Sequence, residues 1–179
     1  MGRDGPHDAK FHPQDSESTM PAKPIPDGYH SVTPYLVIKG AAEAIDHYIQ
    51  VFEASEVMRL VGPDGRIGHA ELKIGDSRVM LADEHPEMDV LAPAEPGRAG
   101  VSILLYVENV DEVVDRAIEA GAQIERPLCD QFYGDRSATL IDPFGHMWTV
   151  ATHIEDVSPE EIQRRMEEMM GGEDEVVFE

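Results

Sequence analysis

Apolar and polar residues alternate along the first half of the chain in a pattern that predicts four strands and one helix. Alternation with a period of two is typical of a half-buried strand, and it covers residues 31–39, 56–61, 67–74 and 78–83. After the first strand, apolar residues recur at the spacing of one helix face, at Ala41, Ala44, Ile45, Tyr48 and Phe52. Glycine-containing turns separate the last three strands. The predicted order is therefore β-α-β-β-β.

The second half of the chain repeats this order, because the segment that begins at Tyr35 aligns with the one that begins at Leu104. Its helix is predicted to follow the N-cap Asn109, and its strands are predicted at residues 101–107, 123–126, 137–141 and 147–152. A repeat of this length is a supersecondary unit that cannot bury its apolar face alone. We therefore expect an α+β fold of two paired βαβββ modules, with module one at residues 28–84 and module two at residues 100–157.

The segments outside the modules differ from them in composition. Residues 1–27 are polar, contain five prolines and show no periodicity, which predicts a disordered leader. Residues 85–99 hold three prolines and are predicted to be a linker. A helix is expected over residues 158–172, where its apolar stripe needs a surface to dock on. Residues 173–179 are predicted to be an acidic tail.

The charge and the cysteine count narrow the classes of partner. The formal net charge of −22 over 179 residues argues against nucleic acid, whose phosphates need lysine and arginine. No apolar run approaches the length of a membrane span, so no membrane partner is expected. A single cysteine, Cys129, cannot form an internal disulfide, and the expected location is the reducing cytoplasm.

Three motifs carry a family resemblance, and they are Thr33-Pro-Tyr-Leu-Val, Gly68-His-Ala-Glu-Leu and Asp142-Pro-Phe-Gly-His-Met-Trp. With two βαβββ modules, they resemble the vicinal oxygen chelate superfamily, which contains glyoxalase I, bleomycin-resistance proteins and extradiol dioxygenases. The chain is most similar to the glyoxalase/bleomycin-resistance-like proteins often called PhnB-like. The resemblance implies that the two modules form a cupped mixed sheet and that the protein is a homodimer.

Metal-dependent members of that superfamily place histidine or glutamate ligands on the first and last strands of each module. Carried over by pattern, these positions fall at or near Thr33, Val79, Ser102 and Thr149. None of these side chains is a usual ligand for a divalent metal. The resemblance thus favours a protein that binds a small organic ligand in the cup, with no metal cofactor.

Two candidate catalytic residues, His69 and Glu71, alternate on one predicted strand and therefore share a face. They could act in the cup as a base and the residue that orients it, or they could face solvent on a plain half-buried strand. Candidate ligand-binding residues are Tyr35 and Tyr106 on the first strands, and Tyr133 and Arg136 in a polar loop. The aromatic rings suit a flat organic ligand. Arg136 could bind an anion, or it could pair with an acidic residue and hold the loop in place.

An alternative function is a metal-dependent lyase, isomerase or dioxygenase with a relocated site for a divalent ion, drawn from His30, His69, Glu71 and His153. Whether the protein is an enzyme therefore stays open at this point. A third possibility is an interaction protein that docks through the methionine-lined helix at residues 158–172. His146 follows a turn glycine and is predicted to lie at the surface.

Overall fold

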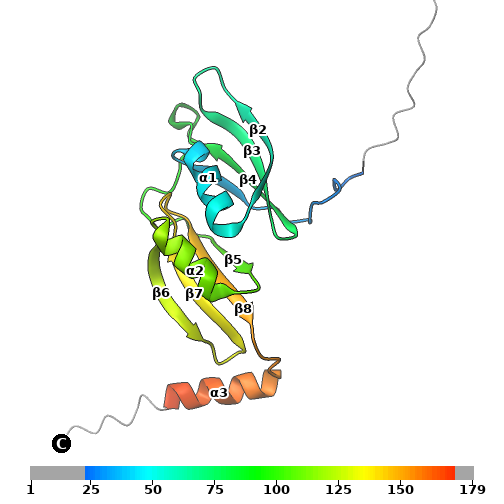
Figure 1. The fold of residues 1–179 in the computed structure, drawn as a ribbon, viewed down its shortest axis with the longest axis vertical. Coiled ribbons are helices and arrows are strands. Elements are labelled where there is room, and N and C mark those ends of the chain that lie inside the picture. The colour runs from blue at the N-terminus through cyan, green and yellow to red at the C-terminus, as the bar shows by residue number, and fades with distance from the viewer. Residues whose placement is uncertain (1–22, 172–179) are drawn as a thin grey trace, which may run out of the picture.

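The computed structural model describes residues 23–171, which include both modules and the C-terminal helix (Figure 1). Most of the predicted leader and the predicted acidic tail lie outside these residues, and residues 23–27 belong to no helix or strand. Module one contains β1 (Tyr35–Ile38), α1 (Ala41–Phe52), β2 (Ser55–Val61), β3 (Ile67–Ile74) and β4 (Ser77–Asp83). Module two contains β5 (Ser102–Tyr106), α2 (Val110–Glu119), β6 (Gln123–Asp130), β7 (Asp135–Ile141) and β8 (Met147–His153), and α3 (Pro159–Gly171) follows it.

Each module forms one four-stranded mixed sheet with the same topology. The strand orders are β1-β4-β3-β2 and β5-β8-β7-β6, and in each sheet the first strand runs parallel to the last while the other pairs are antiparallel. Tyr35 lies opposite Met80 and Leu104 lies opposite Thr149, so the repeat seen in the sequence is also a repeat of strand register. The predicted α+β fold of paired βαβββ modules is confirmed.

One face of each sheet packs on its helix, and the other face is open. On β3, Ala70, Leu72 and Ile74 point to α1 and are buried. Because strand side chains alternate between faces, His69 and Glu71 lie on the opposite face, which we call the open face. The open faces carry many exposed apolar side chains, among them Tyr35, Met58, Leu60, Leu104 and Tyr106.

The two modules meet in a shared core at the hairpin before β8. Trp148 is buried, and its ring lies 4.6 Å from that of Phe52 and 5.3 Å from that of Tyr48, centroid to centroid. Asp142 is also buried, and its Oδ2 atom accepts hydrogen bonds from the Tyr48 hydroxyl at 2.7 Å and from Trp148 Nε1 at 3.0 Å. The core of the molecule therefore crosses from α1 to module two.

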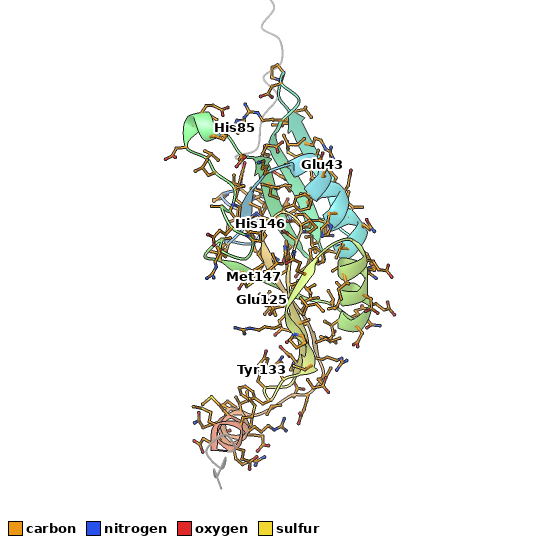
Figure 2. All side chains as sticks on the ribbon, turned by 90° about the vertical axis from the view of Figure 1, so that its left-hand side faces the viewer. Glu43, His85, Glu125, Tyr133, His146 and Met147 are labelled. Carbon is orange, nitrogen blue, oxygen red and sulfur yellow. The ribbon has the colours of Figure 1, made fainter. Side chains whose placement is uncertain are left out.

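His146 was predicted to lie at the surface, and this prediction is wrong. The residue is only 7% exposed, and Figure 2 places it with Met147 at the level where the two modules meet. Its Nε2 atom lies 3.2 Å from the carbonyl oxygen of Val37 in β1. The turn glycine suggested a hairpin tip in solvent, but the tip is covered because module one packs on it.

The C-terminal helix α3 projects from the end of module two (Figure 1). Arg165 anchors it through an ion pair with Glu155 at 2.7 Å and a hydrogen bond to the carbonyl oxygen of Phe132 at 3.3 Å. Met169 and Met170, which belong to the predicted apolar stripe, are 61% and 67% exposed. Within residues 23–171, no helix combines the length and the apolar character required to cross a bilayer.

Candidate functional site

A connected group of polar side chains occupies the open face of module one. The Tyr35 hydroxyl lies 3.2 Å from Nδ1 of His69, and Nε2 of His69 lies 3.3 Å from Oε1 of Glu71. The other carboxylate oxygen, Oε2, accepts a hydrogen bond from the hydroxyl of Tyr29. Both candidate catalytic residues are thus brought together with the candidate ligand-binding residue Tyr35, and none of the three points into the helix-side core.

The carboxylate of Glu71 is held in its charged form by its neighbours. Its pKa lies below the ordinary value, first because Tyr29 donates a hydrogen bond to it and then because His69 and Arg78 favour its negative charge. The same hydrogen bond raises the pKa of Tyr29. The guanidinium of Arg78 lies over the Tyr29 ring, 5.4 Å from its centroid, which fixes the ring by a cation–π contact.

A second polar group lies on the open face of module two, at its far end. The buried carboxylate of Asp135 accepts a hydrogen bond from the Tyr106 hydroxyl at 2.8 Å, and its other oxygen lies 2.7 Å from Nδ1 of His153. Nε2 of His153 lies 3.0 Å from Asp156. Asp135, and to a lesser extent Asp156, raises the pKa of His153 because both stabilise the imidazolium.

A cavity of about 710 Å³ lies where β1 of module one approaches β5 of module two. Its walls are mostly apolar and come from both first strands, the linker and the start of β8. Tyr35, Leu104 and Met147 line it, and Arg98 from the linker contributes a cationic group. A volume in the range of about 300–1,000 Å³ with a few polar groups is typical of small-molecule sites.

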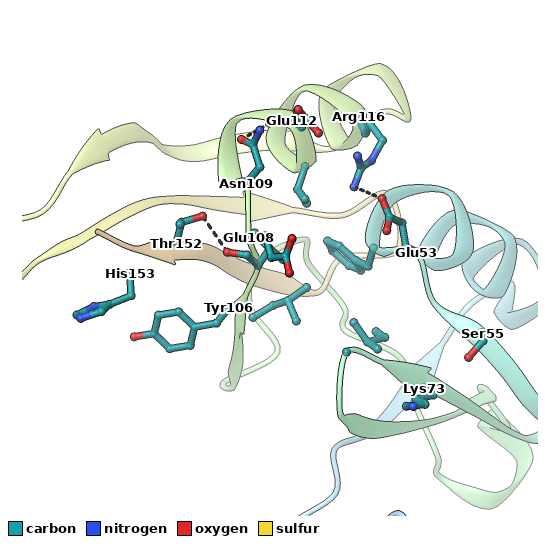
Figure 3. Close-up of a pocket in the computed structure, with 16 residues that line it drawn as sticks. Glu53, Ser55, Lys73, Tyr106, Glu108, Asn109, Glu112, Arg116, Thr152 and His153 are labelled. Atoms are coloured by element: carbon teal, nitrogen blue, oxygen red, sulfur yellow. Dashed lines mark hydrogen bonds and ion pairs between the residues drawn. The ribbon is translucent and has the colours of Figure 1, made fainter. Parts of the chain in front are cut away.

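A larger cleft of about 1010 Å³ opens on the other side of the junction, between the end of α1, the β3–β4 turn and the start of α2 (Figure 3). Figure 3 shows Tyr106 and His153 side by side at one end and the ion pair between Glu53 and Arg116 at the other. Charged and polar side chains, including Lys73, dominate the labelled residues. The cleft therefore differs in character from the apolar cavity beside β1.

The two remaining candidate ligand-binding residues lie away from both spaces. Tyr133 stands at the far end of module two (Figure 2) and packs edge-on against Phe132. Arg136 forms ion pairs with Asp111 and Asp130, both at 2.8 Å. Its guanidinium thus ties the end of β6 to the start of α2, and a ligand role for Arg136 stays a prediction.

The residues present do not fit a divalent metal at the positions implied by the family resemblance. Val79 has no donor atom, and Thr149 shares a hydrogen bond with Thr139 at 3.0 Å. Among residues 23–171, no group of three or more histidine, cysteine, aspartate or glutamate side chains is arranged to hold a metal ion. Of the fallback candidates, only His69 and Glu71 are in contact; His30 lies 3.8 Å from Asp76, and His153 belongs to the cluster of module two.

Sequence reasoning missed Tyr29 and Arg98 as site residues, and it missed the contacts of Asp135 with Tyr106 and His153. Tyr29 precedes the first strand, Asp135 opens β7, and Arg98 lies in the linker. The contacts of Asp135 depend on the β7–β8 register, which places it opposite His153. For Tyr29 the available signal was an aromatic residue two positions before the strand predicted at residues 31–39.

Comparisons with known proteins identify the family. The profile of the Glyoxalase/Bleomycin resistance protein/Dioxygenase superfamily matches residues 28–150. An uncharacterized protein of Mycobacterium tuberculosis (strain H37Rv) is 38% identical over 169 residues, covering 93% of this chain and 96% of the relative. Two solved structures are each 28% identical to this chain: TioX from Micromonospora sp. ML1, with a TM-score of 0.54, and a protein from Pseudomonas aeruginosa, with a TM-score of 0.58. Each comparison covers 70% of this chain and 99% of the other protein.

Proposed function

The chain belongs to the glyoxalase/bleomycin resistance protein/dioxygenase superfamily, and we propose that it binds a small, largely apolar organic molecule without the metal ligands usual in that group. The observation that carries this proposal is the cavity of about 710 Å³ beside β1 and β5. Its apolar walls would take up a flat ligand by burying apolar surface, while Tyr35 and Arg98 supply the few polar contacts that orient it.

The open faces support a homodimer as the form that binds the ligand. Within residues 23–171 the two sheets are separate, and β1 and β5 each lie at a sheet edge with one side unpaired. Exposed strand edges and contiguous apolar faces are features that soluble proteins usually cover. A second copy of the chain carries a strand edge and an apolar face of the same kind, which could cover those of the first. A two-fold axis would place module one of one copy against module two of the other.

The chemistry of the ligand follows from the lining. Apolar walls with the Tyr35 ring favour a hydrophobic body. Arg98 at the lining favours a carboxylate or another anionic group, which would compete with its exposed contact to Glu95 at 4.0 Å. The single cysteine supports a reducing cytoplasmic setting. The net charge of −22 supports solubility and opposes nucleic acid as a partner.

Binding of 8-anilinonaphthalene-1-sulfonate, a planar anionic probe, tests the proposal. We expect Leu104→Glu, which places a carboxylate in the cavity wall, to weaken binding by about tenfold or more, equivalent to about 1.4 kcal/mol. The matched control is Met88→Glu, because Met88 is also an exposed apolar residue, 63% against 53% for Leu104, but does not line the cavity. Equal affinities for the two variants would refute the proposed site.

Light scattering of the full chain tests the dimer separately. We expect a mass of twice 19.8 kDa for the unmodified protein, and a monomer for Leu60→Glu, which introduces a charge on the open face of β2. A monomeric wild-type protein that still binds the probe would refute the dimer and leave the cavity proposal standing.

A further inference from the structure

The fold holds His146, a buried residue in the wall of the cavity beside β1 and β5, in one orientation. Its backbone amide donates a hydrogen bond to Oδ1 of Asp142 at 2.8 Å, and its carbonyl oxygen accepts one from the Asp142 amide at 2.9 Å. Its ring is tied to β1, because Nε2 lies 3.2 Å from the carbonyl oxygen of Val37. A side chain that is held at both ends presents the same edge of its ring to the cavity.

The contact with Val37 decides which ring nitrogen of His146 carries the proton. A carbonyl oxygen only accepts hydrogen bonds, so Nε2 is protonated and donates to it. In the neutral imidazole the other nitrogen, Nδ1, is then a hydrogen-bond acceptor. The ring therefore has one acceptor site that the contact with β1 leaves unused.

This acceptor opens toward the cavity. Within residues 23–171, Nδ1 of His146 takes part in no hydrogen bond, whereas Nε2 and both backbone groups have partners. In that part of the chain the enclosed side-chain nitrogen or oxygen atom without a partner is Nη1 of Arg78, so Nδ1 is not enclosed by protein atoms. His146 is only 7% exposed, and it lines the cavity of about 710 Å³ but not the larger cleft.

The cationic residue of the same wall lies next to His146. The amide of Gly97 donates a hydrogen bond to the carbonyl oxygen of Gly145 at 2.9 Å, and Arg98 and His146 directly follow these two glycines in the sequence. The linker is thus tied to the hairpin at the point where both residues line the cavity. The side chain of Arg98 is 79% exposed, so it is free to turn to a ligand. An anionic group bound to Arg98 brings the neighbouring atoms of that ligand to His146.

We propose that His146 selects the ligand, and that the cavity takes a planar organic anion with an N–H or O–H donor beside its anionic group. Arg98 pairs with the anion, Nδ1 of His146 accepts the hydrogen bond of the donor, and apolar walls that include Leu104 and Met147 cover the flat body. This inference rests on the proposed function and adds the class of ligand to it. A compound of the same shape without the donor leaves the acceptor in the cavity unpaired, which costs affinity.

Two carboxylates of the same shape test the proposal by displacing 8-anilinonaphthalene-1-sulfonate from the full chain at about pH 8, where a free imidazole is neutral. Indole-2-carboxylate has an N–H beside its carboxylate, and benzofuran-2-carboxylate has an oxygen in that position. We expect indole-2-carboxylate to bind about tenfold more tightly, since it gains one hydrogen bond and leaves no acceptor unpaired. Equal affinities, or tighter binding of benzofuran-2-carboxylate, would overturn the role of His146.

The ratio of the two affinities separates a ligand contact from structural support, because a structural defect lowers both affinities together. His146→Leu should bring the ratio to within about twofold of one. His146→Gln should keep part of the preference, since its amide can donate to Val37 and still present an acceptor oxygen. The matched control is His47→Leu, which replaces another buried histidine, 8% exposed, that does not line the cavity; it should keep the full preference. An undiminished preference in His146→Leu would overturn the proposal.

A measurement on the unmodified protein decides the matter even if His146→Leu does not fold. In protein labelled with ¹⁵N in its histidines, NMR should show Nδ1 of His146 as the unprotonated ring nitrogen. Indole-2-carboxylate should shift the Nδ1 resonance, and benzofuran-2-carboxylate should shift it clearly less. A protonated Nδ1, or equal shifts with both compounds, would overturn the proposal.

Failure of this inference is distinguishable from failure of the proposed function. If neither carboxylate displaces the probe although Leu104→Glu weakens its binding, the ligand class is overturned and the cavity stands. If the probe binds Leu104→Glu and Met88→Glu equally well, the cavity itself is refuted, and the selection by His146 is refuted with it.

Discussion

Replacement of Asp142 by alanine should destabilise the protein more than replacement of any exposed turn aspartate. The Asp142 carboxylate is buried and accepts four hydrogen bonds, from the Tyr48 hydroxyl, from Trp148 Nε1 and from the backbone amides of Phe144 and His146. In the alanine variant these donors stay buried without their acceptor. Unsatisfied buried donors are costly because folding has already removed them from water.

The size of the effect follows from the two side-chain partners. A hydrogen bond to a charged group contributes about 1.5–3 kcal/mol, so Tyr48 and Trp148 together account for about 3–6 kcal/mol. The variant no longer buries a carboxylate, which returns part of this free energy. We therefore expect a loss of about 3–5 kcal/mol from the free energy of unfolding, a large part of the about 5–15 kcal/mol typical of a native domain.

Urea unfolding at neutral pH, followed by tryptophan fluorescence and by circular dichroism, measures this loss. Trp148 is the single tryptophan in the sequence and is buried at the junction of the modules, so its fluorescence reports on this site. The control is Asp64→Ala, which removes an exposed aspartate from the corresponding kind of turn in module one and should leave the midpoint nearly unchanged. A loss below about 1 kcal/mol for Asp142→Ala would refute the assignment of these bonds as the support of the junction.

Two further predictions concern the charged groups of module two. The raised pKa of His153 means that its ion pairs stabilise the fold fully below the pKa of the unfolded state, and that this stabilisation is lost as the pH rises through the pKa of the folded state. His153→Gln should therefore lower the free energy of unfolding more at about pH 5.5 than at about pH 8.5. An equal loss of free energy at both pH values would contradict this prediction. Arg136→Ala should change the urea midpoint only slightly, and should change it even less in high salt. The affinity for the anilinonaphthalene probe should stay unchanged. A large loss of affinity would instead make Arg136 a ligand contact.

The strands and helices were predictable because each module has one buried and one open sheet face. Alternation placed β3 correctly at both ends, and helical spacing did so for α1. Two strands differ from their predicted bounds by four residues: the first was expected to begin at residue 31 but β1 begins at Tyr35, and β6 was expected to end at Arg126 but continues to Asp130. Pairing between β6 and β7 shifts register on both sides of Arg126, and such bulges interrupt the alternation that predicts a strand.

The contacts of the site were less predictable, because they depend on register and on packing between modules. His69 and Glu71 share a strand, so their proximity followed from a period of two. The contact between Asp135 and His153 requires the β7–β8 register, and the burial of His146 requires module one to pack on the hairpin. A single sequence carries no local signal for either of these arrangements.

The hairpin from Asp142 to Trp148 carries much of the family resemblance, and most of its contacts are structural. Asp142 holds Tyr48 of α1, and His146 contacts the carbonyl oxygen of Val37 in β1. Val37, His146 and Met147 also line the cavity of about 710 Å³. The hairpin therefore sets the distance between β1 and the start of β8, and with it the width of the space that Tyr35 faces. A sequence that keeps this hairpin can change the residues of the open faces, and thus its ligand, without losing the arrangement of the modules.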